Sequence, residues 1–218
     1  MKKAIIVVLV VLFSTLGMAQ FKYLEPDILP NGVGKLSIGF DTFMRYGIFD
    51  IVEVGLSPLP YIKFGMQLND FWASAGYGYF PSFADFYESN TIFTSVGYYP
   101  DDFSASLSGM YSENEDWIYD TVTSTPIEVK SFAVIGRVIL ENRKKNGDMT
   151  LSGGYSLDIN ETEHSGFVSF DVGSNFKWDW WIFRNIYIYG GLGANFPFRD
   201  LRSIFILGGI EAKFQFFK

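Results

Sequence analysis

Most of this chain, from residue 33 onward, consists of segments in which every second side chain is apolar. In residues 103–111, Phe, Ala, Leu, Gly and Tyr alternate with Ser and Met, and residues 148–157 and 165–178 show the same alternation with mostly small polar partners. Successive side chains of a β-strand point to opposite faces, so this period predicts strands with one apolar and one polar face. An all-β protein is therefore expected.

Turn-forming residues separate the segments, as at Asn69-Asp70 and Asn146-Gly147-Asp148, and Arg45-Tyr46 is also assigned to a turn. The resulting count is about 10–12 strands, with the segment at 116–122 the weakest. The predicted strands are 33–44, 47–57, 60–68, 70–80, 91–99, 103–111, 116–122, 127–141, 148–157, 165–178, 182–194 and 202–217. A chain of 218 residues with this pattern is expected to form one domain.

The N-terminus has the three parts of a secretory signal peptide. Lys2 and Lys3 precede an apolar stretch at 4–13, and small residues lead to Ala19. We therefore expect residues 1–19 to be a cleaved signal peptide, 20–32 an N-terminal extension, and 33–218 the barrel domain. A retained N-terminal anchor is the alternative. The sequence has no Cys, which excludes both a lipid-anchored lipoprotein and disulfide bonds.

Composition also excludes one class of partner. The formal net charge is −7, and removal of residues 1–19 would take away two Lys and no acidic residue. Neutralising phosphates requires a basic surface, so a nucleic-acid partner is not expected.

Two architectures satisfy strands with one apolar and one polar face. A soluble barrel that binds an apolar ligand turns the apolar phase inward, whereas a transmembrane barrel turns it toward lipid. Three features favour the membrane: long strands with short connections, a polar phase rich in Ser, Thr, Asn and Gly, and aromatics near strand ends. The aromatic girdle is predicted at Tyr98, Tyr99, Trp178, Trp180 and Trp181. The predicted fold is a single antiparallel transmembrane β-barrel.

Charged side chains of both signs fall on the polar phase, which would face the interior of such a barrel. The predicted lumen-facing residues are Lys35, Asp41, Glu53, Lys63, Asp171, Lys177, Glu211 and Lys213. Such residues either line a water-filled pore and tune its ion selectivity, or pair across the interior and close it. Both possibilities stay open at this point.

In pattern, residues 33–218 resemble small bacterial outer-membrane β-barrel proteins. The stretch RYGIFDIVEVGLS at 45–57 is similar to their hairpin units, and the last strand is amphipathic and aromatic near its end, with Phe214 and Phe216 in the apolar phase. Phe217 and Lys218 depart from the usual aromatic terminus. The resemblance implies an outer-membrane location, membrane lipid and the barrel assembly machinery as partners, and a role as a small channel or a structural or surface component.

The sequence offers little for catalysis. With no Cys and His164 as the only His, a zinc site is not expected, and no cofactor or metal site is predicted. The triplet Glu163-His164-Ser165 contains the residue types of a lipid-modifying barrel enzyme, which is a second alternative. However, adjacent strand residues face opposite sides, so His164 and Ser165 would not meet. We therefore expect no enzyme activity.

Overall fold

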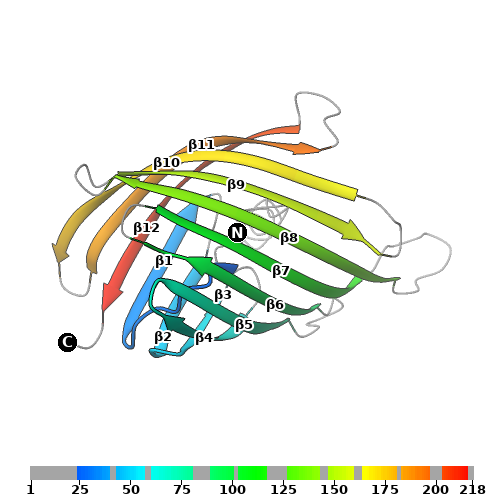
Figure 1. The fold of residues 1–218 in the computed structure, drawn as a ribbon, viewed down its shortest axis with the longest axis horizontal. Helices are drawn as coiled ribbons and strands as arrows, with labels where there is room; N and C mark the ends of the chain where they lie inside the picture. The colour runs from blue at the N-terminus through cyan, green and yellow to red at the C-terminus, as the bar shows by residue number, and fades with distance from the viewer. Residues whose placement is uncertain are drawn as a thin grey trace, which may run out of the picture.

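The structure is a computed structural model, and it describes residues 24–39, 43–56, 60–80, 89–100, 103–116, 127–142, 147–159, 164–180, 183–196 and 203–215. Twelve antiparallel strands form a closed barrel in which each strand pairs with its neighbours in sequence and β1 pairs with β12 (Figure 1). The strands are β1 (Val33–Gly39), β2 (Phe43–Phe49), β3 (Val52–Leu56), β4 (Pro60–Leu68), β5 (Phe71–Phe80), β6 (Ser89–Tyr98), β7 (Phe103–Asp116), β8 (Ile127–Asn142), β9 (Gly147–Asp158), β10 (His164–Trp180), β11 (Phe183–Phe196) and β12 (Ile204–Gln215).

The two ends of the barrel differ in the length of their connections. At one end, which we call the short-turn end, the strands are joined by two or four residues, and this end also holds the start of β1 and the end of β12. At the other, the loop end, the connections have three to ten residues. In Figure 1 the short-turn end lies at the left, where the C-terminus is marked. Transmembrane barrels of bacteria have short periplasmic turns and longer extracellular loops.

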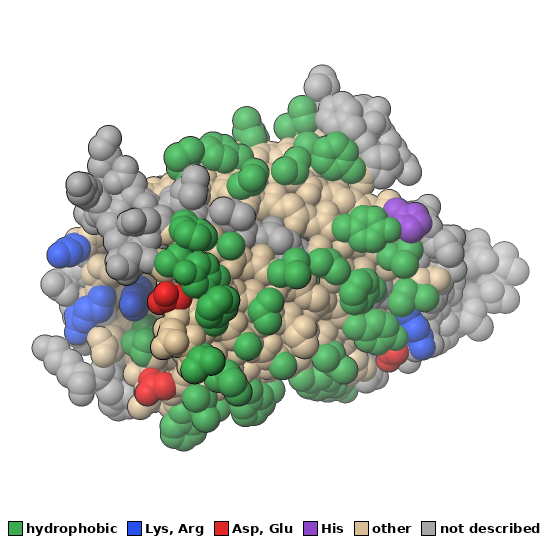
Figure 2. Space-filling view, in the orientation of Figure 1, with side chains coloured by type: hydrophobic (Ala, Val, Ile, Leu, Met, Phe, Trp, Pro, Cys, Tyr) green, Lys and Arg blue, Asp and Glu red, His purple; other side chains and the backbone are tan. Residues whose placement is uncertain are grey.

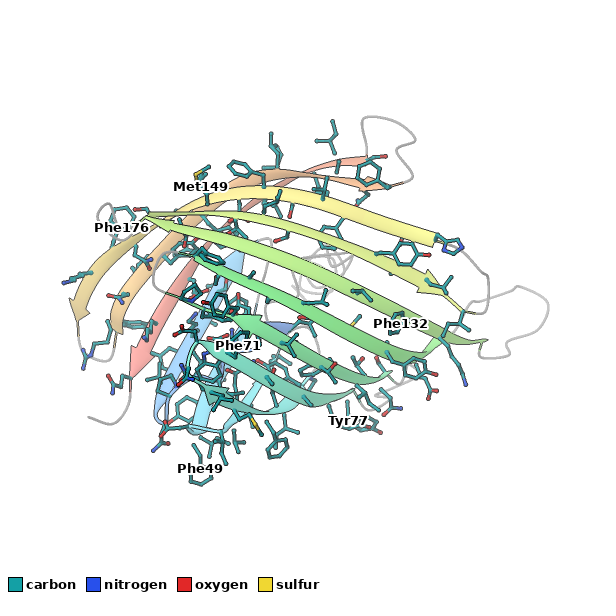
Figure 3. All side chains as sticks on the ribbon, viewed as in Figure 1. Phe49, Phe71, Tyr77, Phe132, Met149 and Phe176 are labelled. Carbon is teal, nitrogen blue, oxygen red and sulfur yellow. The ribbon has the colours of Figure 1, made fainter. Side chains whose placement is uncertain are left out.

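The apolar phase of the strands faces outward. Along β6, buried Thr91, Phe93 and Ser95 alternate with exposed Ile92, Thr94 and Val96. Large apolar side chains cover the face shown in Figure 2, including those labelled in Figure 3. Ile206 is 77% exposed, as expected for a side chain that contacts lipid rather than a protein core. The predicted all-β barrel with outward apolar residues is confirmed.

Phe214 is an exception on the outer surface. It belongs to the same phase of β12 as Ile206 and Ile210, but only 8% of it is exposed. Its ring lies across Gly34 of the adjacent β1, where a Cβ would come within 2.1 Å of Phe214 Cζ. The aromatic ring therefore covers the seam at which β1 and β12 close the barrel.

Tyrosines near the loop end mark where the outer surface becomes polar. Tyr77 donates a hydrogen bond of 2.5 Å to Asn90, and Tyr111 donates one of 2.6 Å to Glu113. Tyr155 contacts the ring nitrogen Nδ1 of His164. Amphipathic rings with their hydroxyls toward polar groups are typical of the level at which a barrel meets the lipid headgroups.

Inner-face glycines leave room for aromatic rings that lie against the barrel wall. Phe93 covers Gly76 and Phe167 covers Gly154, with the nearest ring atoms 2.2 and 2.3 Å from where a Cβ would stand. The same arrangement occurs at other inner positions: Tyr61 on Gly55, Tyr187 on Gly173 and Phe205 on Gly193. Aromatic rings that cover glycines of a neighbouring strand are a known way to stabilise sheets. This pairing explains why the chain is rich in both residue types.

Two details of the sequence prediction are wrong. The segment 47–57 is not one strand, because β2 and β3 form a tight hairpin with Asp50 and Ile51 at its turn. Arg45 lies within β2, not in a turn. Of the predicted strand at 116–122, Asp116 is the last residue of β7, and the remainder lies outside the described residues. The twelve strands of the ring agree with the predicted count of about 10–12.

Nowhere in the described residues is there a helix long and apolar enough to cross a membrane.

Substituting an outward residue with Arg should distinguish lipid from water as the surroundings. Leu107 of β7 is exposed and lies farther from the short-turn end than Phe103 on the same face. We expect Leu107→Arg to lower the free energy of unfolding in lipid vesicles by about 2–4 kcal/mol, and Phe103→Arg by much less, because the cost of a charge depends on depth. Urea titrations followed by Trp fluorescence measure both. Equal, small effects would contradict the lipid-facing assignment.

Candidate functional site

A cluster of buried charges lies on the inner wall of β2, β3 and β4. Arg45, Glu53 and Lys63 come from these three adjacent strands, and the side chains of all three are 0% exposed. Glu53 is paired in register with Lys63 across β3 and β4, and their charged atoms are 3.0 Å apart. Arg45 donates two hydrogen bonds of 2.9 Å to the Glu53 carboxylate, one from Nε and one from Nη2.

Glu53 is the centre of this cluster. Besides Arg45 and Lys63, it accepts a hydrogen bond of 2.9 Å from the hydroxyl of Tyr61 and one of 3.1 Å from the backbone N–H of Leu29. A carboxylate removed from water needs several such donors, because the cost of desolvating an ion is large. Gly55, next to Glu53 in the same phase, leaves the space in which Tyr61 lies.

The donor from Leu29 belongs to a segment that precedes β1 and lies inside the barrel. We call residues 24–32 the inner segment; its start is the dark blue stretch within the ring in Figure 1. Arg45 donates from Nη1 to the Glu25 carboxylate at 2.7 Å and from Nη2 to the Asp27 carbonyl oxygen at 3.2 Å. Lys63 donates to the carbonyl oxygens of Glu25 and Asp27, both at 2.9 Å.

The inner segment runs inside the barrel from β1 to the strand on the opposite side of the ring. It leaves β1 at Val33, and Gly32 donates a backbone hydrogen bond to Gly47 of β2. At its other end, the Leu24 carbonyl oxygen accepts a hydrogen bond of 2.8 Å from Ser108 of β7. In a ring of twelve, β7 is the strand diametrically opposite β1. The inner segment therefore runs along the inner wall over half of the ring, from β1 to β7.

Apolar side chains pack around the start of the inner segment. Leu24 packs in a buried cluster with Tyr61, Phe93 and Phe167, which come from β4, β6 and β10, and Met110 of β7 packs against it. The rings of Tyr61 and Phe93 meet edge to face at 6.0 Å between centroids. Side chains from several sides of the barrel thus converge on the tip of the inner segment.

Glycines again allow the close approach of the inner segment to the wall. A Cβ on Gly65 of β4 would come within 2.7 Å of Ile28 Cγ1, and one on Gly97 of β6 within 2.5 Å of Pro26 Cγ. At Gly47 of β2 a Cβ would meet the carbonyl oxygen of Leu29 at 2.1 Å. A side chain at Gly47 would meet the backbone of the segment, whereas one at Gly65 or Gly97 would meet the side chain that faces it.

The predicted lumen residues do not form one site. Glu53 and Lys63 belong to the cluster on β2–β4, whereas Lys35 and Glu211 form a separate ion pair of 3.2 Å between β1 and β12. Lys213 is half-buried and lies beside Lys35 in register.

Asp171 and Lys177 lie farther from these ion pairs. Asp171 is buried on β10, and Lys177 of the same strand is exposed. Asp41 lies outside the described residues. Arg45 was missed, because its place in the inward phase of β2 was hidden by the turn assigned to it.

Small hydroxyl side chains line much of the remaining inner wall. Their members on the longer strands β7, β9 and β10 include Ser104, Ser112, Thr150, Ser152 and Ser169, all buried. Opposite the charge cluster, Tyr187 donates a hydrogen bond of 2.5 Å to Asp148 across the interior face of β9–β11. The interior therefore has a charged, filled side and a side lined by hydroxyls.

Four residues of the predicted aromatic girdle lie at or next to strand ends at the short-turn end. Tyr98 ends β6 and packs against Phe71, with ring centroids 4.8 Å apart, and against Phe103 at 5.8 Å. Tyr99 follows it and lies beside Gly97. Trp180 is the last residue of β10, and Trp178 lies two residues before it. Trp181 lies outside the described residues.

His164 and Ser165 lie on opposite faces of the barrel wall. His164 is exposed and contacts Tyr155, whereas the Ser165 hydroxyl is 2.6 Å from that of Ser156 on the inner face. In Figure 2 the only His of the chain is the purple side chain. In the described part of the chain, no group of three His, Asp or Glu side chains is placed to hold a metal ion.

No protein-family model matches this sequence, and no curated protein does. Three solved structures have similar folds. They are a loop-deletion mutant of OmpT, an outer membrane protein of Vibrio cholerae (15% identity, 90% of this chain, TM-score 0.46), an anion-selective porin from Comamonas acidovorans (9%, 80%, 0.45) and OccK10 (OpdN) of Pseudomonas aeruginosa (10%, 81%, 0.41). The likeness is to bacterial outer-membrane barrels.

This chain covers 66%, 58% and 60% of the lengths of those three structures, which is less than two thirds of each. At such identities the likeness concerns the fold alone.

Removing the carboxylate of Glu53 should strongly destabilise the barrel. Glu53→Ala leaves Arg45 and Lys63 buried with a partner missing, and the loss of one member of a buried ion pair costs about 3–5 kcal/mol. Lys35→Ala serves as the control, because the Lys35–Glu211 pair is partly exposed and should contribute about 1 kcal/mol or less. Urea unfolding in detergent micelles compares the two variants. Equal losses would show that Glu53 is not the centre of the interior.

Proposed function

We propose that this protein is an integral outer-membrane β-barrel that acts as a small channel for polar solutes. The observation that carries the proposal is the facing of the two strand phases. Exposed apolar side chains such as Ile206 and Leu151 cover the outside, and buried hydroxyls such as Ser152 and Ser169 line the inside. A barrel with an apolar exterior and a polar interior suits a bilayer and offers solutes a polar path.

The proposed location rests on the same facing together with the N-terminal sequence. We propose export by a signal peptide cleaved after Ala19, insertion by the barrel assembly machinery, and contact with membrane lipid as the main surroundings. The short-turn end would then face the periplasm and the loop end the outside. The polar partners of Tyr77 and Tyr111 lie at the loop end, where the headgroup region would be.

The alternatives receive less support. A soluble barrel would turn Ile206, Phe170 and their neighbours inward, but these side chains are exposed. A lipid-modifying enzyme of the type considered would need His164 beside a nucleophile, and Ser165 lies on the other face of the wall. We therefore propose no enzymatic role. A purely structural role is the outcome that remains if the barrel does not conduct.

Planar-bilayer recording tests the channel. Purified, folded protein should show discrete conductance steps, and its folded state is checked by its faster gel mobility before heating. Fractionation should place the mature chain in the outer membrane. Recovery from the soluble periplasmic fraction would contradict the membrane assignment, and silence of every folded preparation, including variants with a weakened inner segment, would favour a structural role.

A further inference from the structure

The inner segment occupies part of the lumen at the level of the charge cluster. It contacts β2 and β4 through Arg45 and Lys63 and reaches β7 through Ser108. Leu24, its first described residue, packs in the apolar cluster with Phe93 and Phe167, which come from β6 and β10. The lumen is therefore narrower at this level than it would be without the segment.

The wall binds the carboxylates of the inner segment in the way that a protein binds a free anion. The Glu25 carboxylate takes the one Arg45 nitrogen that Glu53 does not use, at 2.7 Å, and the Asp27 carboxylate lies 3.4 Å from Nη2. A guanidinium is suited to binding carboxylates and phosphates in this way. The segment thus presents two carboxylates to a cationic site built from wall residues.

Burial also distinguishes the wall from the segment. The side chains of Arg45, Lys63 and Glu53 are fully buried, whereas those of Glu25 and Asp27 are 15% and 28% exposed. The carboxylates of the inner segment therefore lie at the accessible edge of the cluster. Without them, the wall retains two cations against the single carboxylate of Glu53, which is a net positive site that faces the lumen.

We propose that residues 24–32 are a removable plug, and that its carboxylates occupy a lumenal anion site formed by Arg45 and Lys63. Small solutes that carry carboxylate or phosphate groups compete with the plug for this site, and the channel conducts when the plug leaves. The proposal rests on the proposed channel function. It assigns to the inner segment a role as a tethered competitor of the solute.

A disulfide tests whether the plug has to move. The chain has no Cys, and Ile28 lies against Gly65, where a Cβ would be 2.7 Å from Ile28 Cγ1. The double variant Ile28→Cys/Gly65→Cys is suited to forming a bond at this distance, because the cysteines replace the contacting side-chain atoms. We expect the oxidised form to be silent in planar bilayers and the reduced form to conduct. Wild type with and without oxidant and the single variant Ile28→Cys are the controls.

A second variant tests the anion site without a cross-link. Glu25→Gln/Asp27→Asn keeps the shape of the plug but removes both charges, so the cluster of five charged side chains changes from net −1 to net +1. We expect an open probability roughly tenfold higher, the effect of weakening one charge-assisted hydrogen bond. The reversal potential should shift toward anion selectivity. Sodium succinate at constant ionic strength should raise the open probability of wild type.

The outcomes separate the two proposals. If the oxidised and reduced forms of the cysteine variant conduct equally, residues 24–32 are not the plug, and the channel function stands. If oxidation silences the cysteine variant but neither succinate nor inorganic phosphate changes the open probability of wild type, the proposed anion site is contradicted. If folded wild type, reduced cysteine variant and Glu25→Gln/Asp27→Asn are all silent, the channel function fails, and the plug proposal fails with it.

Discussion

The pairing of β1 with β12 is the constraint on which the rest of the structure depends. It runs from Val33 opposite Gln215 to Gly39 opposite Gly209 and converts an open sheet of twelve strands into a ring. Within a bilayer, an unpaired strand edge would leave backbone groups without hydrogen bonds, which is prohibitively costly, so only closed barrels span as strands. Closure also gives the chain an inside and an outside, and it fixes which phase of every strand contacts lipid.

Closure creates a second problem, because a ring of twelve strands encloses more space than one layer of small side chains fills. The chain fills it unevenly. On β2–β4 the interior is packed by the charge cluster and by the inner segment. On β9–β12, rings such as Tyr187 and Phe205 lie against inner glycines, which keeps them close to the wall. The aromatic content that the sequence suggested for lipid contact is thus divided between the two faces.

Much of the fold could be predicted from the sequence, because alternation and outward facing are local properties of each strand. In residues 103–111, for example, the alternation of apolar and mostly Ser side chains is enough to assign the two faces of the strand. The hairpin of β2 and β3 could not be predicted in this way. Its turn, at Asp50 and Ile51, is only two residues long, and the apolar Ile51 and Val52 make the pattern continuous across it. Because the predicted strands placed a turn at Arg45, this residue was not predicted to face the lumen. Its inward position follows only from the correct bounds of β2.

The position of the inner segment in the lumen could not be predicted from the sequence, for a different reason. Residues 20–32 have no period and contain Pro26 and Pro30, so they were assigned only as an extension. Their place in the lumen depends on partners 18 to 84 residues away in the sequence, from Asp27 with Arg45 to Leu24 with Ser108. Contacts of such separation arise from closure of the ring, which brings β7 opposite β1. Of the wall residues that contact the inner segment, only Glu53 and Lys63 were predicted beforehand as lumen-facing.

The position of the charge cluster also has a structural logic. It joins strands on the side of the ring where the strands are short, since β2, β3 and β4 have 7, 5 and 9 residues, while β7–β11 have 12 to 17. Short strands contribute few ladder hydrogen bonds, so a carboxylate that binds side chains of both neighbouring strands compensates for them. The same arrangement ties this wall to the inner segment through Leu29. Burying both Arg45 and Lys63 with Glu53 as their only carboxylate would cost much free energy. Water or an anion therefore has to enter the site when the segment leaves. Stability of the short-strand wall and occupancy of the lumen are therefore coupled through the same two cations.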